Sequence, residues 1–492
     1  MSDGSVPSSA PPRGRGRGKE PPPELVTNGL DGRTGRYLLA ECELPEILAL
    51  IARDGRNPHD PAPPNTRRLV AGRDPERLDQ AGWGVVFGRS VSGEIREALA
   101  PLLEWRRQQA TAGGEELFHQ VTSAATPEKP ETKKSLLTRF DAGAGPVDPR
   151  RVPYYLLLVG DPTELGFPLQ YHLGIQHAVG RLWLDSPEDY RRYAETVVAA
   201  EKREIEAARQ VAVFAPSNPH DQATKLSSAE LASPMATWLR VRTDWDVAES
   251  VGSDASKPRL ESLLDDAMDR PALVFTASHG LGFAKGDVLQ STCQGALVCQ
   301  EWPGPEHPVA PEHYLAAADL DHLGGCLGTV GFHFACYGAG TPAFDDFKPR
   351  HELATEPFVS PLPRKMLGRG GALAVIGHVD RAWSCSFYWR SIGRQLTVFE
   401  DCFYRLLNGS PVGRALSGFW ERAAELGLDL LSDLESIDFG RKESAVVGDW
   451  TAYRDARNTV LLGDPAVRLA VPRGEDEAEP QDTESRASLR HS

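Results

Sequence analysis

Hydrophobic and polar positions alternate in blocks along the chain: short apolar runs bounded by Gly, Pro and Asp are followed by longer amphipathic segments. The apolar runs predict buried strands at 82–88, 154–162, 211–216, 271–277, 295–299, 329–335 and 371–377. The spacing of apolar residues predicts helices at 94–110, 186–210 and 257–270. Strands alternating with helices predict an α/β protein with largely parallel sheets.

Composition shifts along the chain suggest its domain organisation. Residues 1–25 are rich in Pro, Gly, Ser and Arg, and 473–492 form a polar, acidic segment, so we expect both ends to be disordered tails. Between them we expect an N-terminal α/β region at 26–150, a first subdomain at 151–270 and a second at 271–472. A Gly-Asp-Pro turn follows the apolar residues at both 154–159 and 461–462, which hints at two similar halves, although chance explains so common a turn equally well.

Charge and targeting signals narrow the classes of partner. With 69 acidic against 54 basic side chains the formal net charge is -15, which disfavours binding to nucleic acid. The run RGRGRGK at 13–19 is the local exception, and we interpret it as a solvated tail rather than an RNA site. No apolar run approaches the roughly 18 residues that span a bilayer, and no apolar stretch follows the basic N-terminus. We therefore expect a cytoplasmic protein that does not enter a membrane.

Two predicted strands end in residues that carry chemistry. The strand at 271–277 is followed by Ser278, His279 and Gly280, and the strand at 329–335 by Cys336. Parallel strands place their carboxyl ends at one edge of a sheet, so a thiol and an imidazole would meet there. The imidazole would activate the thiol as nucleophile, and the backbone N–H groups of Gly280 and Cys336 would form an oxyanion hole. Such a dyad needs neither a metal nor a cofactor.

The order of these motifs resembles that of the caspase-like cysteine peptidases. In those enzymes a buried strand ending in His-Gly precedes one ending in Ala-Cys, and here the two reactive residues are 57 positions apart. YYLLLVGDP, AVGRL followed by Ser-Pro-Glu-Asp, and LLGDPAVRL resemble landmarks of the gingipain family over about residues 150–470. The resemblance implies a caspase-like three-layer fold with two similar subdomains. It also implies a cysteine endopeptidase that forms an acyl-enzyme on peptide or protein substrates.

Specificity in caspase-like enzymes often comes from a charge in the loop after the next strand. Here that loop contains Asp380, which would pair with a substrate Arg or Lys, and Trp383, which would flank the aliphatic stem of that side chain. Asp345 and Asp346 compete for the same role. An ion pair between Asp380 and Arg381 is an equally good reading of the acid. The preference of gingipains for basic residues agrees with an acid here only by analogy.

Other reactive residues have simpler readings. Four side chains are of zinc-binding types but match no compact finger spacing, so we expect no metal site: Cys293, Cys299, His307 and His313. His220 and Asp221 follow the strand at 211–216 and either orient His279 or serve in a turn or helix cap. Seven scattered cysteines suit reduced thiols, and we interpret three as packing residues: Cys326, Cys385 and Cys402.

Two functions from other classes remain as alternatives. A catalytically weak scaffold could keep a caspase-like fold for binding partners, although the presence of both Cys336 and His279 argues against it. A nucleotide-linked hydrolase is suggested by the Gly-Asp-Pro turns, but the chain has no GxxxxGK[ST] loop. The sequence does not determine the oligomeric state.

Overall fold

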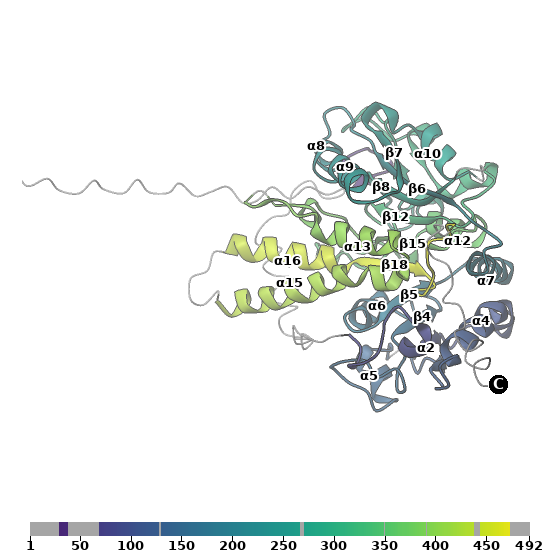
Figure 1. Ribbon diagram of the computed structural model, residues 1–492. Helices are drawn as coiled ribbons and strands as arrows, with labels where there is room; N and C mark the ends of the chain where they lie inside the picture. Colours follow the sequence, from purple (N-terminus) through teal and green to yellow (C-terminus); the bar gives the residue numbers. More distant parts are fainter. Residues whose placement is uncertain are drawn as a thin grey trace, which may run out of the picture.

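The computed structural model describes residues 29–37, 68–126, 129–265, 270–348, 350–389, 391–436 and 443–472. The two predicted tails and Cys42 lie outside these ranges. Figure 1 shows a central sheet seen nearly along its edge, with helices on both sides and a pair of long helices, α15 and α16, extending beyond it.

Ten strands form the central sheet. In spatial order they are β3 (Phe118–Thr122), β2 (Trp83–Phe87), β4 (Tyr155–Val159), β5 (Ala178–Leu182), β18 (Thr459–Gly463), β15 (Ala374–His378), β12 (Val330–Phe334), β8 (Pro271–Ala277), β6 (Ala208–Ala215) and β7 (Asp246–Val251). Most of these strands are buried along their whole length, which explains why the sequence shows continuous apolar runs rather than alternation.

The sheet divides into two parallel halves of opposite direction. Neighbouring strands are parallel everywhere except between β18 and β15, which are antiparallel. The α/β prediction with largely parallel strands is therefore confirmed. The two Gly-Asp-Pro turns follow β4 and β18, which both belong to the first half, so this sequence echo does not mark the two halves.

Helices cover both faces of the sheet and give three layers (Figure 1). On one face lie α2 (Leu78–Ala81), α3 (Gly93–Ala98), α4 (Ala100–Thr111), α7 (Pro187–Glu201) and α12 (Pro361–Gly368). On the other lie α5 (Lys133–Thr138), α6 (Phe167–Gly174), α9 (Ser233–Arg242), α13 (Thr397–Leu407), α14 (Val412–Ala415) and α15 (Ser417–Ser436), with α16 (Glu443–Arg457) packed along α15. Alternate residues of β2 and β4 belong to different apolar clusters, as a sheet covered on both faces requires.

All three predicted helices differ from the observed ones at their ends. The helix predicted at 257–270 is the shorter α10 (Lys257–Leu263). The segment 94–110 forms two helices, because α3 ends at Ala98 and Pro101 occupies the first turn of α4. The helix that begins after the cap Ser186 ends at Glu201 instead of continuing to 210. Arg203 has a left-handed backbone (φ 65°), and the Ala207 N–H donates to Ala470 O, so the chain leaves the helix to enter β6.

Small sheets and short helices surround the second half. A four-stranded sheet contains β1 (Gly29–Asp31), β9 (Gly280–Gly282), β10 (Leu297–Val298) and β11 (Tyr314–Leu315). Two pairs are β13 (Gly340–Thr341) with β14 (Phe358–Val359) and β16 (Tyr388–Trp389) with β17 (Gly393–Arg394). The short helices are α8 (Gln222–Ser227), α10 (Lys257–Leu263) and α11 (Gln290–Cys293). Strand pairing crosses the boundaries predicted near 150 and 270, because β2 pairs with β4 and β6 with β8.

Candidate active site

His279 and Cys336 follow neighbouring strands of the second half. Strands β8 and β12 are parallel and in register at their ends, with Phe334 opposite Ala277, and the Ser278 N–H donates to Phe334 O at 3.2 Å. The structure thus brings the imidazole-bearing and thiol-bearing residues to the same edge of the sheet. Both side chains are fully buried.

Gly280 allows the two strand ends to approach closely. A Cβ placed on Gly280 would lie 1.8 Å from Cys336 O and 3.0 Å from Cys336 N, distances at which no side chain fits. The backbone after the histidine therefore packs directly on the backbone of the cysteine, which only a glycine permits. This places the two residues predicted to form an oxyanion hole side by side.

The backbone around Cys336 also adopts a strained conformation. Tyr337 and Asp380 both have left-handed backbones, with φ of 56° and 74°, and the Tyr337 N–H donates to Asp380 O at 2.7 Å. Such conformations cost about 1–3 kcal/mol each for residues with side chains and cluster at functional sites. The loop after β15 is thereby fastened to the turn that carries the thiol.

Asp221 lies against the imidazole. His279 Nε2 is 2.8 Å from Asp221 Oδ2, and both side chains are fully buried. Asp221 also caps α8, because its carboxylate accepts the N–H groups of Ala223 and Thr224. Both roles considered for Asp221 from the sequence therefore occur together, whereas His220 is exposed.

Electrostatics favour an ionised Asp221. Burial raises the pKa of this carboxyl, but attraction to His279 and hydrogen bonds from His279, Thr224 and Tyr37 outweigh burial and hold its pKa well below the usual range. A carboxylate on Nε2 keeps a proton on that nitrogen, so Nδ1 is the basic nitrogen of the neutral ring. Within the described ranges, Nδ1 is buried and has no hydrogen-bond partner.

Two aromatic rings pack against the imidazole. The Trp302 ring centroid lies 5.7 Å from that of His279 at an interplanar angle of 90°, and the Tyr37 centroid lies 5.8 Å away at 55°. These contacts restrict rotation of the ring and keep water from it. His279 therefore contacts one carboxylate and two aromatic rings.

The sulfur of Cys336 contacts the loop that follows β15. The Ala382 N–H donates to Cys336 Sγ at 3.3 Å, and the thiol in turn faces Ala382 O at 3.8 Å. Asp455 of α16 fixes this loop by accepting the Trp383 N–H at 2.8 Å and the Ser386 hydroxyl. Sequence patterns gave no signal for Asp455, because it lies more than a hundred positions from Cys336 and belongs to an otherwise ordinary helix.

Asp380 contacts Arg381, the partner that the sequence left as an alternative. Its Oδ1 lies 3.1 Å from Arg381 Nη1, and its Oδ2 is buried without a hydrogen-bond partner among the described residues. Burial raises the pKa of Asp380 to about 8; Arg381 opposes the rise, and the nearby Asp345 and Asp346 add to it. The acid is thus held next to the nucleophile turn with one oxygen uncommitted.

The two competing acids are committed to other partners. Asp345 receives both Nη1 and Nη2 of Arg381 at 2.8 Å, and its Oδ1 also accepts the Phe347 N–H. Asp346 pairs with Arg454 at 3.0 Å and Arg457 at 2.6 Å, two residues of α16. Of the three aspartates, Asp380 is the one that retains an unpaired oxygen.

Trp383 lies in a different environment from the one expected of a residue flanking a substrate. It is buried in an apolar cluster with Phe347, at a ring distance of 5.0 Å, and with Trp450. Its contact with a substrate stays a prediction.

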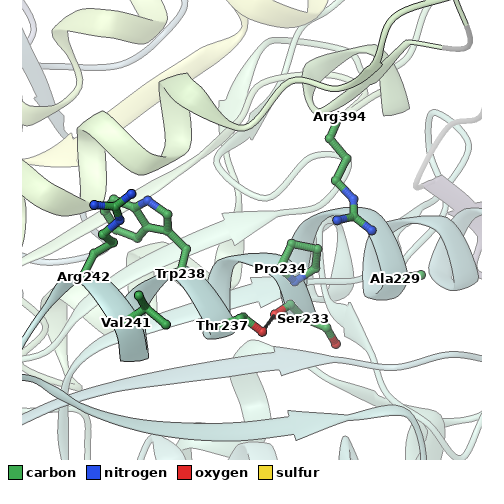
Figure 2. Close-up of a pocket in the computed structure, with 8 residues that line it drawn as sticks. All are labelled: Ala229, Ser233, Pro234, Thr237, Trp238, Val241, Arg242 and Arg394. Carbon is green, nitrogen blue, oxygen red and sulfur yellow. Dashed lines mark hydrogen bonds between the residues drawn. The ribbon is translucent and has the colours of Figure 1, made fainter.

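The cavity shown in Figure 2 lies elsewhere. It has a volume of about 510 Å³, and its lining contains none of the predicted site residues: Ala229, Ser233, Pro234, Thr237, Trp238, Val241, Arg242 and Arg394.

The zinc-type residues are used in other ways. Cys299 Sγ faces Leu297 O, and His313 Nδ1 accepts the Ala310 N–H. Across the described ranges, no three His, Cys, Asp or Glu side chains gather in a way that could hold a metal ion. In the same part of the chain, no helix has the length and apolar character to cross a bilayer.

No protein-family model and no curated protein sequence matches the chain. Among solved structures, one described as a protease is 14% identical, with 80% of each chain covered and a TM-score of 0.48. The complex of the pro- and mature domains of Porphyromonas gingivalis RgpB, a gingipain, is 12% identical, with 80% of this chain and 81% of that chain covered and a TM-score of 0.45. Similarity this distant says nothing about the chemistry of the chain, and the α/β fold follows from its own strand pairing.

Proposed function

We propose that the protein is a cysteine endopeptidase in which Cys336 is the nucleophile and His279 its acid–base partner. The observation that carries the proposal is the pairing at one sheet edge. His279 follows β8, Cys336 follows the adjacent parallel strand β12, and a buried carboxylate on Nε2 leaves Nδ1 free to take a proton. Nucleophile, base and orienting acid are the parts that acyl transfer requires.

In the proposed reaction His279 Nδ1 removes the thiol proton, and Cys336 Sγ attacks the carbonyl carbon of the scissile peptide bond. The negative charge that develops on the carbonyl oxygen is met by the backbone N–H groups of Gly280 and Cys336. The imidazolium then gives its proton to the departing amine and a thioester remains. Water, deprotonated by the same imidazole, hydrolyses the thioester, releases the acid and restores the thiol. Asp221 keeps the ring in one tautomer throughout.

A basic residue before the scissile bond is the substrate class we propose. Asp380 supports it, because its Oδ2 has no hydrogen-bond partner among the residues that the structure describes and its backbone is tied to Tyr337, the residue after the nucleophile. A guanidinium or ammonium group that reached this oxygen would favour the ionised acid. Asp345 is a weaker candidate, since Arg381 already binds both of its oxygens.

The burial of the dyad favours a second candidate, a scaffold with little turnover. Cys336 and His279 have no exposed surface, so a peptide reaches the sulfur only after surrounding loops move. A protein that never opened would keep the fold without the activity. The two candidates make opposite predictions for active-site labelling.

The decisive experiment is labelling with peptidyl acyloxymethyl ketones that carry Arg, Lys or Asp next to the reactive group, followed by mapping of the modified residue. We expect covalent labelling at Cys336, strongest with Arg or Lys, and none in Cys336→Ala or His279→Ala. Cys293→Ala is the matched control, because Cys293 is a partly exposed thiol. This variant should still be labelled at Cys336. Labelling confined to Cys293, or no labelling of folded protein, would favour the scaffold.

A further inference from the structure

The N-terminal segment 29–37 contributes β1 to the small sheet whose strand β9 directly follows His279. Strand β1 pairs in parallel with β9, placing Gly29 opposite Gly280 and Leu30 opposite Leu281, and the Gly32 N–H donates to Gly282 O at 2.9 Å. Leu30 is fully buried in the apolar cluster of this small sheet. A segment far from the catalytic strands in sequence therefore forms one wall of the candidate site.

A tight turn brings Tyr37 back beside Leu30. Asp31 accepts the backbone N–H groups of Arg33 and Thr34, and the Asp31 N–H donates to Arg36 O at 2.9 Å. Gly35 has φ of 69°, and a Cβ there would lie 1.8 Å from His307 O, so glycine is required. The turn fixes where the Tyr37 side chain points.

Tyr37 completes a chain of three side chains. Its hydroxyl donates to Asp221 Oδ1, while the other oxygen of the same carboxylate contacts His279 Nε2. The Tyr37 ring also packs against the imidazole at 5.8 Å. Besides His279, the other donors to Asp221 belong to the first turn of α8, so Tyr37 is the donor that the segment 29–37 contributes to this carboxylate.

The Tyr37 hydroxyl helps to keep Asp221 ionised. Asp221 is fully buried, and burial by itself raises the pKa of a carboxyl. The hydrogen bond from Tyr37 is among the contacts that keep it ionised, and Tyr37 remains a donor because burial and the charge of Asp221 raise the pKa of its phenol. A donor on Oδ1 also fixes the rotation of the carboxylate that puts Oδ2 on Nε2.

We propose that Tyr37 is a positioning residue that acts on His279 through Asp221, so that the N-terminal segment 29–37 is part of the working active site. The inference rests on the proposed role of His279. It goes beyond that role because it makes activity depend on a segment outside the two catalytic strands.

The test is Tyr37→Phe in the full chain, which keeps the ring against His279 and removes one donor. We expect kcat on a cleaved peptide to fall about tenfold with KM little changed, the size typical of one hydrogen bond to a charged group. A second readout needs no turnover: the proton on His279 Nε2, identified by its loss in His279→Gln, should give a downfield NMR signal that moves or broadens in Tyr37→Phe. Tyr155→Phe is the matched control, since the Tyr155 hydroxyl donates to Pro75 O at 2.6 Å in the other half of the sheet.

The outcomes separate the two proposals. An NMR signal and a kcat in Tyr37→Phe that both equal those of Tyr155→Phe would overturn the positioning role while leaving the peptidase proposal intact. A signal that responds to Tyr37→Phe in a protein that cleaves no peptide would support the positioning role and count against the peptidase.

Discussion

Two buried aspartates lie at the candidate site, Asp221 against His279 and Asp380 beside the turn that follows Cys336, and their ionisation differs. Asp221 lies among donors and an imidazole, and its pKa is held well below the usual range. Asp380 lies beside Asp345 and Asp346, shares Arg381 with Asp345, and has a pKa raised to about 8. Burial opposes the charge on both, so the difference comes from their neighbours. Hydrogen-bond donors around Asp221 keep it ionised, whereas the other acids that share Arg381's surroundings favour a protonated Asp380.

The comparison suggests different roles. An ionised carboxylate on His279 can orient the ring and stabilise an imidazolium during the reaction. A neutral Asp380 could ionise when a cationic substrate side chain binds beside it. Losing the charge that Asp221 places against His279 should therefore cost more activity than losing the acid at Asp380.

Asp221→Asn should remove the orienting charge and permit the wrong imidazole tautomer. We expect kcat/KM to fall about 10²–10⁴-fold, roughly 3–5 kcal/mol, in a protein that still folds. Steady-state hydrolysis of a labelled peptide measures it. The neighbouring exposed His220→Asn is the control and should retain full activity. A loss of less than threefold in Asp221→Asn would mean that the carboxylate serves only to cap α8.

The pH dependence of stability should distinguish the two acids. Asp380 keeps its proton in the folded state to about pH 8, whereas the unfolded chain loses it near pH 4, so this group makes the protein less stable as pH rises between those values. A difference of about 4 pKa units corresponds to roughly 5 kcal/mol in total. Asp221, with its lowered pKa, stabilises the fold above about pH 4 and loses that contribution below it.

Urea unfolding at pH 5 and pH 8 tests the effect of Asp380. As pH rises, the wild-type protein should lose unfolding free energy relative to the Asp380→Asn variant. Equal pH dependence in the two proteins would show that Asp380 is ionised in the folded state.

Asp380→Ala should alter which peptides are cleaved and leave the dyad intact. Turnover of Arg and Lys substrates should drop by about 30-fold or more, corresponding to roughly 2–5 kcal/mol for a partly buried charge pair, whereas alkylation of Cys336 by a small reagent should not change. An acid that formed only a surface pair would change turnover by less than about 1 kcal/mol. Asp346→Ala provides the matched comparison, because Arg454 and Arg457 occupy that carboxylate. Cleavage after acidic or small apolar residues would contradict the proposal for Asp380.

The strands and the two reactive residues could be predicted from the sequence because their signals are local. The runs at 271–277 and 329–335 gave β8 and β12 to within a residue or two, and period and composition suffice for strands buried on both faces. The order His-Gly then Ala-Cys placed His279 and Cys336 at strand ends. Helix ends were less predictable. The helix predicted at 186–210 ends at Glu201, because Ala207 before β6 bonds to Ala470, a residue far along the chain.

Partners distant in sequence were decided by tertiary structure. Tyr37, Asp221 and His279 come from three separate segments, and no spacing rule relates a tyrosine in an N-terminal turn to a carboxylate at a helix cap. The opposite directions of the two half-sheets likewise depend on β18, the last strand of the chain, entering between β5 and β15. The pKa of Asp380 depends on which acids and cations share its buried space. Local pattern fixes backbone conformation and burial, whereas hydrogen bonding and charge inside the fold depend on packing between segments.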